Sequence, residues 1–436
     1  RPDGHRPALS GPGPVDPAAA GGRRRTFTRG SARGHTPGGL AESGRSRLHA
    51  TLRAVDEDGL VLRGRFARGL TLRSGWVDGA AEHTAKILAD TLPSGARFEV
   101  TYAFEDEAGR LGESAVARFT TAPGARFGRK TSAAQSFVWT ADTAGQGYGI
   151  NPEIGGMRGY AAMHATMPDF FLHSGDTIYA DNPIPETLEV AGEPTWRNLV
   201  TEETSKVAET LNEFRGRHRY NMMDDNLRAL YADVPVIAQW DDHETTNNWW
   251  PGEVLEDPRY TQVRDVDTLA ARARRAWQEY MPIADSTALR RGSGFEPARI
   301  YRRIPRGATL DVFALDMRTH KGENTQRLET HETPILGEEQ LQWLIRGLRA
   351  AFTDFEPFWE FVAGPINAGS FGPNTLDGTF GPRLDFEAHG PVMGSPRSGE
   401  HQYFGHVEIP EDGREFRVRL INAAGRTVYS RTLTAA

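Results

Sequence analysis

The sequence predicts an α+β protein with more than one domain, and strand-like and helix-like patterns both support this. Short apolar runs that lead into acidic or glycine-containing loops indicate buried strands, and they occupy residues 136–141, 170–172 and 234–240. Helical periodicity occurs at Val200–Phe214 and at Thr268–Tyr280. Alternating apolar and polar residues at 48–122 and 402–434 indicate strands before and after the helical part.

Composition narrows the class of protein. A length of 436 residues allows two domains and a tail. The net charge of −7 gives no basic face for nucleic acid or for a membrane surface, so we expect no specific nucleic-acid binding. There is no cysteine, which excludes disulfides and thiolate metal sites and fits a secreted or periplasmic protein. No apolar run reaches the roughly 18 residues that a membrane helix needs. We also expect the protein to be a monomer.

The chain divides into three parts. Residues 1–47 are rich in Gly, Pro, Ala and Arg with few large apolar residues, which predicts a disordered tail. Residues 48–122 show short strands, the clearest at 60–63, 98–104 and 115–121, before a linker at 122–125. Residues 131–436 form the last and largest part.

Arginines 23–25 in the tail resemble part of a twin-arginine export signal. Such a signal needs an apolar segment after the arginines, and none follows here. A solvated basic tail is therefore the other reading.

The stretch 173–181 carries the most informative chemistry. Asp176 follows an apolar run through a Gly-Asp turn, and Tyr179 comes three residues later. If the chain turns helically after Asp176, the phenol returns to the same side. Carboxylate and phenol oxygens suit Fe(III), Mn, Mg or Ca. The pair therefore indicates a metal site, with an ordinary turn after a strand as the alternative.

Two further strand ends carry acids. The run at 234–240 leads into Asp242 and His243, groups that are costly to bury unless they are paired or bind a metal. The run at 136–141 leads into Asp142 and a glycine-rich loop. Strand-end loops on a rigid scaffold commonly carry function, so these acids are predicted to meet at one sheet edge.

Together these motifs resemble the alkaline phosphatase D (PhoD-like) branch of the calcineurin-like metallophosphoesterases. The matching motifs are Asp-Thr-Ala-Gly-Gln-Gly at 142–147, Gly-Asp-Thr-Ile-Tyr-Ala-Asp at 175–181, Trp-Asp-Asp-His-Glu at 240–244 and Gly-Pro-Ile-Asn-Ala-Gly at 364–369. The resemblance implies a catalytic domain at 131–436, built as a metallophosphoesterase β-sandwich flanked by helices. It also implies a small immunoglobulin-like or fibronectin-like domain at 48–122.

The resemblance further implies hydrolysis of small phosphomonoesters or phosphodiesters at a dinuclear centre of Fe(III) and Ca, or another divalent metal such as Mn or Zn. Asp176 would bridge the two metals, and Asp142 and Tyr179 would complete the first metal's ligands. Asp242 and Asn367 would serve the second metal. For Asn367, a loop-stabilising role is the alternative.

Catalytic roles are also implied. His243 would stabilise transition-state charge or protonate the leaving alkoxide, with Asp242 beside it. Asp181 is expected to accept a hydrogen bond near the centre, and Glu244 to orient neighbouring ligands.

Some other polar residues have weaker signals. Arg217 and His218 could bind the substrate phosphate, since a planar guanidinium suits bidentate contact; a solvated basic helix end is the alternative. Asp316 and Arg318 are expected to form an internal ion pair.

The chain departs from the family pattern after an amphipathic helix expected to begin near Leu336. At residues 350–352 it runs directly into the segment that in the family follows an Asp-x-His metal-ligand motif, and no such motif occurs near this junction. A catalytically impaired or inactive homologue, acting as a binding or structural module, is therefore the alternative function. The departure predicts weak hydrolysis and unpaired sheet edges. His320 or His331 would be the replacement ligand if two metals bind.

Overall fold

A computed structural model describes most of the chain. It covers residues 25–29, 44–126 except 57, 65, 90 and 91, then 129–130, 132–283, 299–324, 334–349, 358–373, 376 and 383–434. The junction at 350–352 and His331 lie outside the described residues. Within the described part, no helix has both the length and the apolar character that crossing a membrane requires.

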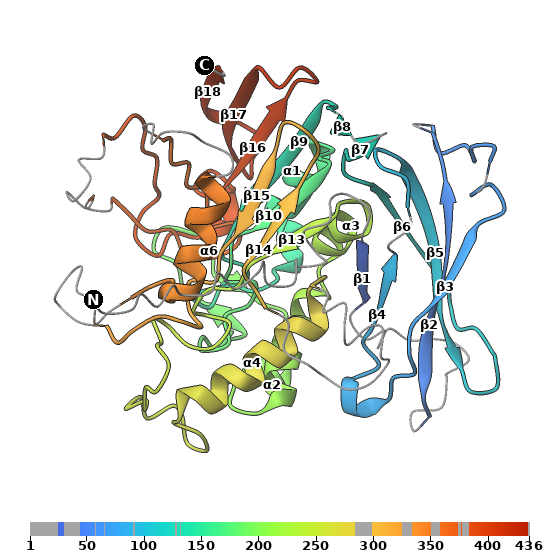
Figure 1. Cartoon of the computed structure of the whole chain (residues 1–436). Helices are drawn as coiled ribbons and strands as arrows, with labels where there is room; N and C mark the ends of the chain where they lie inside the picture. Colours follow the sequence, from blue (N-terminus) through green and yellow to red (C-terminus); the bar gives the residue numbers. More distant parts are fainter. Residues whose placement is uncertain are drawn as a thin grey trace, which may run out of the picture.

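A six-stranded mixed sheet forms the centre of the larger part (Figure 1). Its strands are β9 (Gln135–Thr140), β10 (Phe170–His173), β13 (Val236–Ala238), β16 (Tyr403–Ile409), β17 (Glu415–Asn422) and β18 (Thr427–Thr434), in the order β13-β10-β9-β16-β17-β18. Strands β9, β10 and β13 run parallel, and the remaining pairs are antiparallel. The residues that follow the three parallel strands therefore emerge at one edge of the sheet.

Helices cover one face of this sheet. Tyr160 and Met163 of α1 (Arg158–Ala165) and Leu230 of α3 (Asp225–Asp233) share one buried core with Val138 and Phe171 of the sheet. The neighbouring residues Phe137 and Phe170 belong to a different core on the other face. This division follows from the two-residue period of a strand, which sends successive side chains to opposite faces.

A hairpin and a helix cover the second face. Val312 of the hairpin β14 (Arg302–Pro305) and β15 (Asp311–Ala314) packs against the core that contains Phe137. Trp343 of α6 (Gly337–Arg349) then packs on Phe313 of the hairpin, with ring centroids 5.7 Å apart. The expected α and β layers are thus present. In the described residues, however, the second β layer is a two-stranded hairpin and not a full sheet.

The N-terminal part is built from strands. β2 (Ser46–Ala54), β3 (Leu70–Arg73), β5 (Arg97–Asp106) and β6 (Ala115–Thr120) form a sheet in the order β3-β2-β5-β6, and β1 (Arg25–Arg29) pairs with β4 (Ala85–Ala89). Apolar residues of β2, β4, β5 and β6 share one core. Residues 25–29 therefore form a strand, although they fall within the stretch expected to be disordered.

The strand expected at 60–63 is wrong. Leu60 donates its backbone N–H to the Asp56 carboxylate at 2.8 Å and accepts from the Asp56 N–H at 3.0 Å, which closes a tight turn. Only an isolated bridge joins Val55 and Val61, and the Leu60 side chain is exposed. Turn chemistry at Asp56 overrides the apolar pattern here.

The helix expected at 200–214 is misplaced. The structure has a short 3₁₀ turn, η4 (Glu202–Thr204), and then α2 (Leu211–Asn221). Thr210 and Glu213 form a reciprocal capping box that begins α2 at residue 211. The helix expected at 268–280 is confirmed as α4 (Val266–Tyr280) and the one near Leu336 as α6.

The remaining elements are short. They are η2 (Gly79–Ala81), β7 (Ala125–Arg126), β8 (Arg129–Lys130), η3 (Pro152–Ile154), β11 (Thr187–Leu188), β12 (Trp196–Arg197) and η5 (Pro396–Ser398).

Charged contacts join α2 to α4 and to the segment around η2 in the N-terminal part. Arg215 of α2 forms a bidentate pair with Glu279 of α4, with both N–O distances at 2.7 Å. The same guanidinium donates to the Ala80 carbonyl at 2.8 Å. Arg219 pairs with Glu82 and Glu203, and Tyr280 donates to Glu82 at 2.9 Å. Every carboxylate in this group faces a cation or a hydroxyl donor.

Candidate metal centre

The ends of the three parallel strands bring acidic residues together. Asp142 follows β9, Asp176 follows β10, and Asp242 and His243 follow β13. Asp176, Asp242 and His243 each offer one ligand atom, and these atoms lie within 4.8 Å of one another. The main chains are also linked, because Thr143 donates its N–H to the Asp176 carbonyl at 3.0 Å. The parallel arrangement of the strands therefore creates the cluster.

Tyr179 connects Asp142 to this cluster. Its hydroxyl donates to Asp142 Oδ1 at 2.6 Å, and its ring stacks on His243 with centroids 4.1 Å apart. Gly145 makes room for the ring, since a Cβ there would lie 2.6 Å from it. The Asp142 and Tyr179 oxygens thus lie beside the Asp176, Asp242 and His243 group.

Two of the acids have left-handed backbones. Asp142 has φ 66° and Asp176 has φ 51°, a conformation that costs a residue with a side chain roughly 1–2 kcal/mol. Gly175, with φ +112°, precedes Asp176, and a Cβ there would lie 2.6 Å from the Asp241 Cβ. Glycine at 175 therefore lets the loops after β10 and β13 pack together.

Glu244 holds these two loops in register. Its Oε1 accepts from the Thr177 N–H and hydroxyl, both at 2.6 Å, and its Oε2 accepts from the N–H groups of Asp176 at 3.2 Å and Asp241 at 2.8 Å. The carboxyl is fully buried, and burial raises its pKa to about 7. Glu244 thus fixes the backbone of Asp176 and Asp241, which agrees with the orienting role expected from the sequence.

The electrostatics of the cluster favour a bound cation. Burial raises the pKa of Asp176 well above its usual range, and the negative charges of Asp142, Glu244, Asp242 and Asp241 raise it further. Burial also raises the pKa of Asp142. Acids crowded in this way are costly unless a positive charge is added. Carboxylate, imidazole and phenol donors converging on one point therefore fit a metal ion.

His243 is oriented by Asp181. Its Nδ1 lies 2.8 Å from Asp181 Oδ1, and Asp181 Oδ2 accepts from the Asn247 N–H at 2.9 Å. Burial lowers the pKa of His243, but the hydrogen bond and charge of Asp181 outweigh this, so the net pKa is raised. With Nδ1–H donated to Asp181, Nε2 is left for the centre.

Asn367 lies next to the cluster through its backbone. Its N–H donates to the Asp142 carbonyl at 3.1 Å, and its side-chain nitrogen donates to the Tyr148 carbonyl at 3.1 Å. These contacts agree with a loop-stabilising role. Asn367 as a metal ligand remains a prediction.

The structure packs Arg217 and His218 inside the protein, and Arg217 lines a small cavity together with Tyr179. Both are 2% exposed on α2. Arg217 donates to the Asn182 carbonyl at 2.7 Å and to the Lys206 carbonyl, and His218 stacks on Tyr280 with centroids 5.1 Å apart. These contacts show that both side chains help to pack α2 against its neighbours.

The expected ion pair between Asp316 and Arg318 is wrong. The Arg318 guanidinium instead donates from Nε to Asp241 Oδ1 at 2.6 Å and lies 3.4 Å from Asp242 Oδ1. Asp316 accepts from the indole N–H of Trp240 at 2.9 Å. Arg318 is therefore a residue of the centre that the sequence reading missed. The sequence feature that pointed to such a residue was Asp241, an acid next to Asp242 for which the sequence analysis assigned no partner.

His320 is not a member of the ligand group in the described residues. Its ring lies 6.2 Å from that of Tyr301. The structure therefore gives no replacement for the missing histidine at this position.

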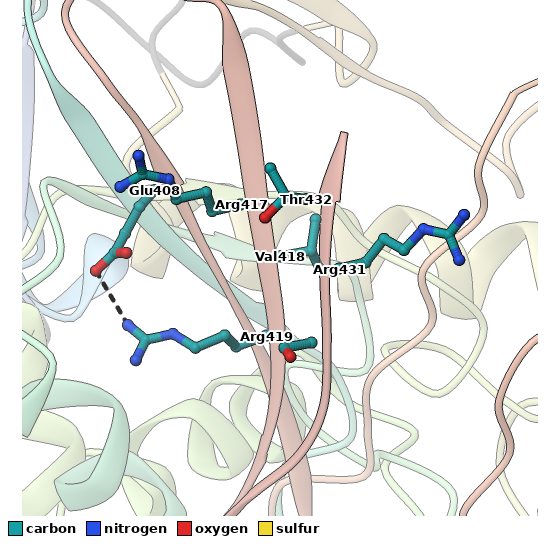
Figure 2. A pocket seen from close by; sticks show the side chains of 7 residues that line it. Glu408, Arg417, Val418, Arg419, Arg431 and Thr432 are labelled. Atoms are coloured by element: carbon teal, nitrogen blue, oxygen red, sulfur yellow. Dashed lines mark hydrogen bonds and ion pairs between the residues drawn. The ribbon is translucent and has the colours of Figure 1, made fainter. Parts of the chain in front are cut away.

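A hollow of about 320 Å³ lies elsewhere, over β16, β17 and β18 (Figure 2). Its charged groups are paired with one another or with nearby acids. Arg419 contacts Glu408 at 3.0 Å, and Arg417 contacts Glu415 at 2.6 Å. It has no converging ligand atoms, and its size alone does not make it the reactive centre.

Comparison with known proteins agrees with a phosphoesterase fold around this centre. Residues 137–352 match the family model described as PhoD-like phosphatase, so this part of the chain belongs to that family. The match ends next to the junction at 350–352.

The chain is also similar to alkaline phosphatase D of Bacillus subtilis (strain 168). The two are 30% identical over 206 residues, which is 45% of this chain and 33% of the relative. The match thus spans about a third of the length of that curated relative.

Two solved structures are similar. The structure of PhoD gives a TM-score of 0.54 at 22% identity, covering 76% of this chain and 58% of the other, and it supports the mixed α and β fold. A purple acid phosphatase from yellow lupin (Lupinus luteus) seeds gives a TM-score of 0.49 at 11% identity, covering 95% of this chain and 73% of the other.

Proposed function

We propose that this chain is a metal-dependent phosphoric ester hydrolase acting on small phosphomonoesters or phosphodiesters. The observation that carries the proposal is the convergence of Asp176, Asp242 and His243 within 4.8 Å, with Asp142 and Tyr179 beside them. The PhoD-like match over residues 137–352 supports the same reaction class.

In this proposal Asp142, Asp176 and Tyr179 hold the first metal, and Asp176 and Asp242 hold the second, with Asn367 as a further candidate. A bound metal would supply a Lewis acid that activates water and offsets charge on the phosphoryl group. Fe(III) suits the phenol at Tyr179, and Ca, Mn or Zn suits the second position. The Asp142 and Asp176 carboxyls are within hydrogen-bonding reach of each other.

His243 and Asp181 form the proposed proton-transfer pair. The Asp181 carboxylate keeps the proton of His243 on Nδ1 when the ring is neutral, and it stabilises the imidazolium when the ring is charged. His243 Nε2 is then the atom that donates a proton to the leaving alkoxide. The stack between His243 and Tyr179 holds the imidazole plane in place.

The second candidate is a catalytically impaired homologue that serves as a binding or structural module. The observation that favours it is that the ligand group found among the described residues contains one imidazole, His243. The absence of an Asp-x-His motif near 350–352 points the same way. If one position of a metal pair is weak, hydrolysis should fall by at least roughly two to three orders of magnitude.

Turnover of p-nitrophenyl phosphate and of its bis-ester, with Fe and Ca supplied, tests the proposal. Metal-dependent release of p-nitrophenol is expected, alongside elemental analysis of metals per chain. Folded protein that binds metal but shows no turnover above the blank would reject the hydrolase and leave the binding module.

The identity of the first metal has a separate test. With Fe(III) bound through Tyr179, the protein should absorb in the visible range by phenolate charge transfer, and Tyr179→Phe should remove that band. A colourless, iron-free and fully active protein would exclude Tyr179 as an iron ligand.

The domain division and the location belong to the same proposal. We infer an immunoglobulin-like or fibronectin-like domain at 48–122, a catalytic domain at 131–436, and a secreted or periplasmic monomer. The separate core of the N-terminal strands supports the division. Expression of residues 131–436 alone should give a cooperative unfolding transition if the division is correct.

A further inference from the structure

Arg318 has a distinctive position at the acidic centre. Its Nε donates to Asp241 Oδ1 at 2.6 Å and its Nη2 lies 3.4 Å from Asp242 Oδ1. Its side chain is 13% exposed. Asp242 belongs to the candidate ligand group and Asp241 does not. Arg318 thus places a fixed positive charge directly beside the metal centre.

Part of this guanidinium is left unpaired. An arginine has five N–H donors, and the carboxylates of Asp241 and Asp242 engage the Nε and Nη2 nitrogens. Within the described ranges, Nη1 of Arg318 has no hydrogen-bond or ion-pair partner, and it is not among the fully buried unpaired atoms. The unpaired Nε of Arg217, by contrast, is fully buried. Arg318 can therefore accept a ligand from solvent at a site where Arg217 cannot.

The loop that carries Arg318 is held rigidly. Gln340 of α6 accepts from the Asp316 N–H at 2.8 Å and donates to the Asp316 carbonyl at 2.8 Å. The Asp316 carboxylate accepts from Trp240 at 2.9 Å and from the Thr319 N–H at 2.9 Å. These contacts fix the backbone on both sides of Arg318. A preorganised donor loses little conformational entropy when a ligand binds.

The centre needs such a cation. A phosphoryl group is an anion, and it must approach several buried carboxylates that already repel one another. A guanidinium presents parallel N–H donors that match two oxygens of a phosphate. Lys321 adds a second positive charge to the same loop; burial lowers its pKa, the charge of Arg318 lowers it further, and Glu253 and Asp242 oppose this.

We propose that Arg318 binds nonbridging oxygens of the substrate's phosphoryl group and that Asp241 positions its guanidinium. The proposal rests on the proposed hydrolase function. It assigns the two adjacent acids different roles, since Asp242 belongs to the candidate ligand group and Asp241 makes the shorter contact to the arginine. Asp241 is thus a positioning residue, and Glu244 fixes its backbone N–H.

Inorganic phosphate is the probe for the test, measured by calorimetry on the metal-loaded full chain and as a competitive inhibitor of p-nitrophenyl phosphate hydrolysis. Arg318→Gln should weaken phosphate binding by roughly 10- to 100-fold, as expected for loss of a charge-assisted bidentate contact. Arg318→Lys keeps the charge but not the fork, so its loss should be smaller. KM should rise more than kcat falls. Arg228→Gln, at a 55% exposed side chain on α3, is the matched control and should bind phosphate normally.

Asp241→Asn tests the positioning role. It keeps the shape of the side chain but weakens the contact to Arg318, so its phosphate affinity should fall between those of the parent and Arg318→Gln. Metal content of each variant is measured in parallel and should stay at the parent value.

The results separate the role of Arg318 in phosphate binding from the proposed hydrolase function. If Arg318→Gln binds phosphate like the parent and changes only metal content or melting temperature, Arg318 is a structural partner of Asp241 and the inference fails. If the parent binds no phosphate, the inference also fails. If the parent binds phosphate through Arg318 but shows no turnover, the inference stands and the hydrolase function fails.

Discussion

Two regions of the chain bury several charged side chains, and they balance the charge differently. Around α2 and α4 the buried acids Glu209 and Glu279 pair with Lys206 and Arg215. At the strand ends, Asp142, Asp176 and Asp242 lie close to one another, and Arg318 is the nearby fixed cation. The charges of the region around α2 and α4 are balanced without a ligand, whereas the acidic region at the strand ends favours a bound cation. Unbalanced buried charge therefore distinguishes the functional region from the structural one.

Asp176→Asn should have the largest effect of these changes, a loss of activity. Removing this carboxylate takes away a proposed metal ligand, so kcat/KM for p-nitrophenyl phosphate should fall by roughly 1,000-fold or more. In chelator, the same change relieves repulsion with Asp142 and Asp242, so the melting temperature should hold or rise. A variant that loses stability in chelator as well would show that the acids are balanced in some other way.

Glu279→Ala should have the opposite profile. It leaves the Arg215 guanidinium buried without its bidentate partner, which typically costs about 3–5 kcal/mol of folding free energy. Activity per folded molecule should be nearly unchanged, as judged by denaturant unfolding beside turnover. The double variant Arg215→Met with Glu279→Leu should recover most of the lost stability, and failure to recover would mean that the pair does more than balance charge.

His218, which lies in the region around α2 and α4, should make the folding stability depend on pH. Burial lowers the pKa of His218 to about 3, below its model-peptide value of 6.5. Between those values the unfolded chain takes up a proton that the native chain does not, so stability should fall as pH drops from 6.5 towards 3. The slope is about 1.4 kcal/mol per pH unit for one histidine. In His218→Phe the unfolding free energy should decline less steeply below pH 6.5, and an unchanged slope would assign the acid sensitivity to other groups.

Arg417→Ala should have the smallest effect. Arg417 lies in the hollow of Figure 2 and pairs with Glu415 at 2.6 Å, with a side chain 51% exposed. An exposed ion pair contributes about 0–1 kcal/mol, so melting temperature, phosphate affinity and turnover should all stay near the parent values. A clear loss of phosphate binding would identify the hollow as a second anion site.

Local sequence patterns predicted the strands that precede the candidate site residues. Asp142, Asp176 and Asp242 each follow an apolar run, and the runs became β9, β10 and β13. This works because a buried parallel strand needs a continuous apolar stretch and because chemistry gathers where such strands end. The expectation that Asp181 accepts a hydrogen bond is confirmed, and the contacts of Glu244 to the Asp176 and Asp241 backbone agree with the orienting role expected for it.

Other features were set by hydrogen bonds and ion pairs that the apolar pattern does not show. The start of α2 was set by a capping box that overrides apolar periodicity, and the strand expected at 60–63 gave way to a turn at Asp56. The sequence does not show which of the two arginines, Arg217 or Arg318, lies beside the acidic cluster. One is buried under backbone carbonyls, and the other pairs with Asp241, 77 residues away along the chain.

The sequence by itself determined which chemistry is available: hard oxygen ligands, an imidazole beside them at His243, no thiolate, and a mixed α and β scaffold. The reason is that residue type and short-range periodicity act locally along the chain. Only the tertiary structure decided which charges meet. The parallel order of β9, β10 and β13 brings the acids into one cluster. The packing of α6 on Asp316 brings Arg318 to that cluster, because electrostatic pairing depends on distance in space and not on separation in sequence.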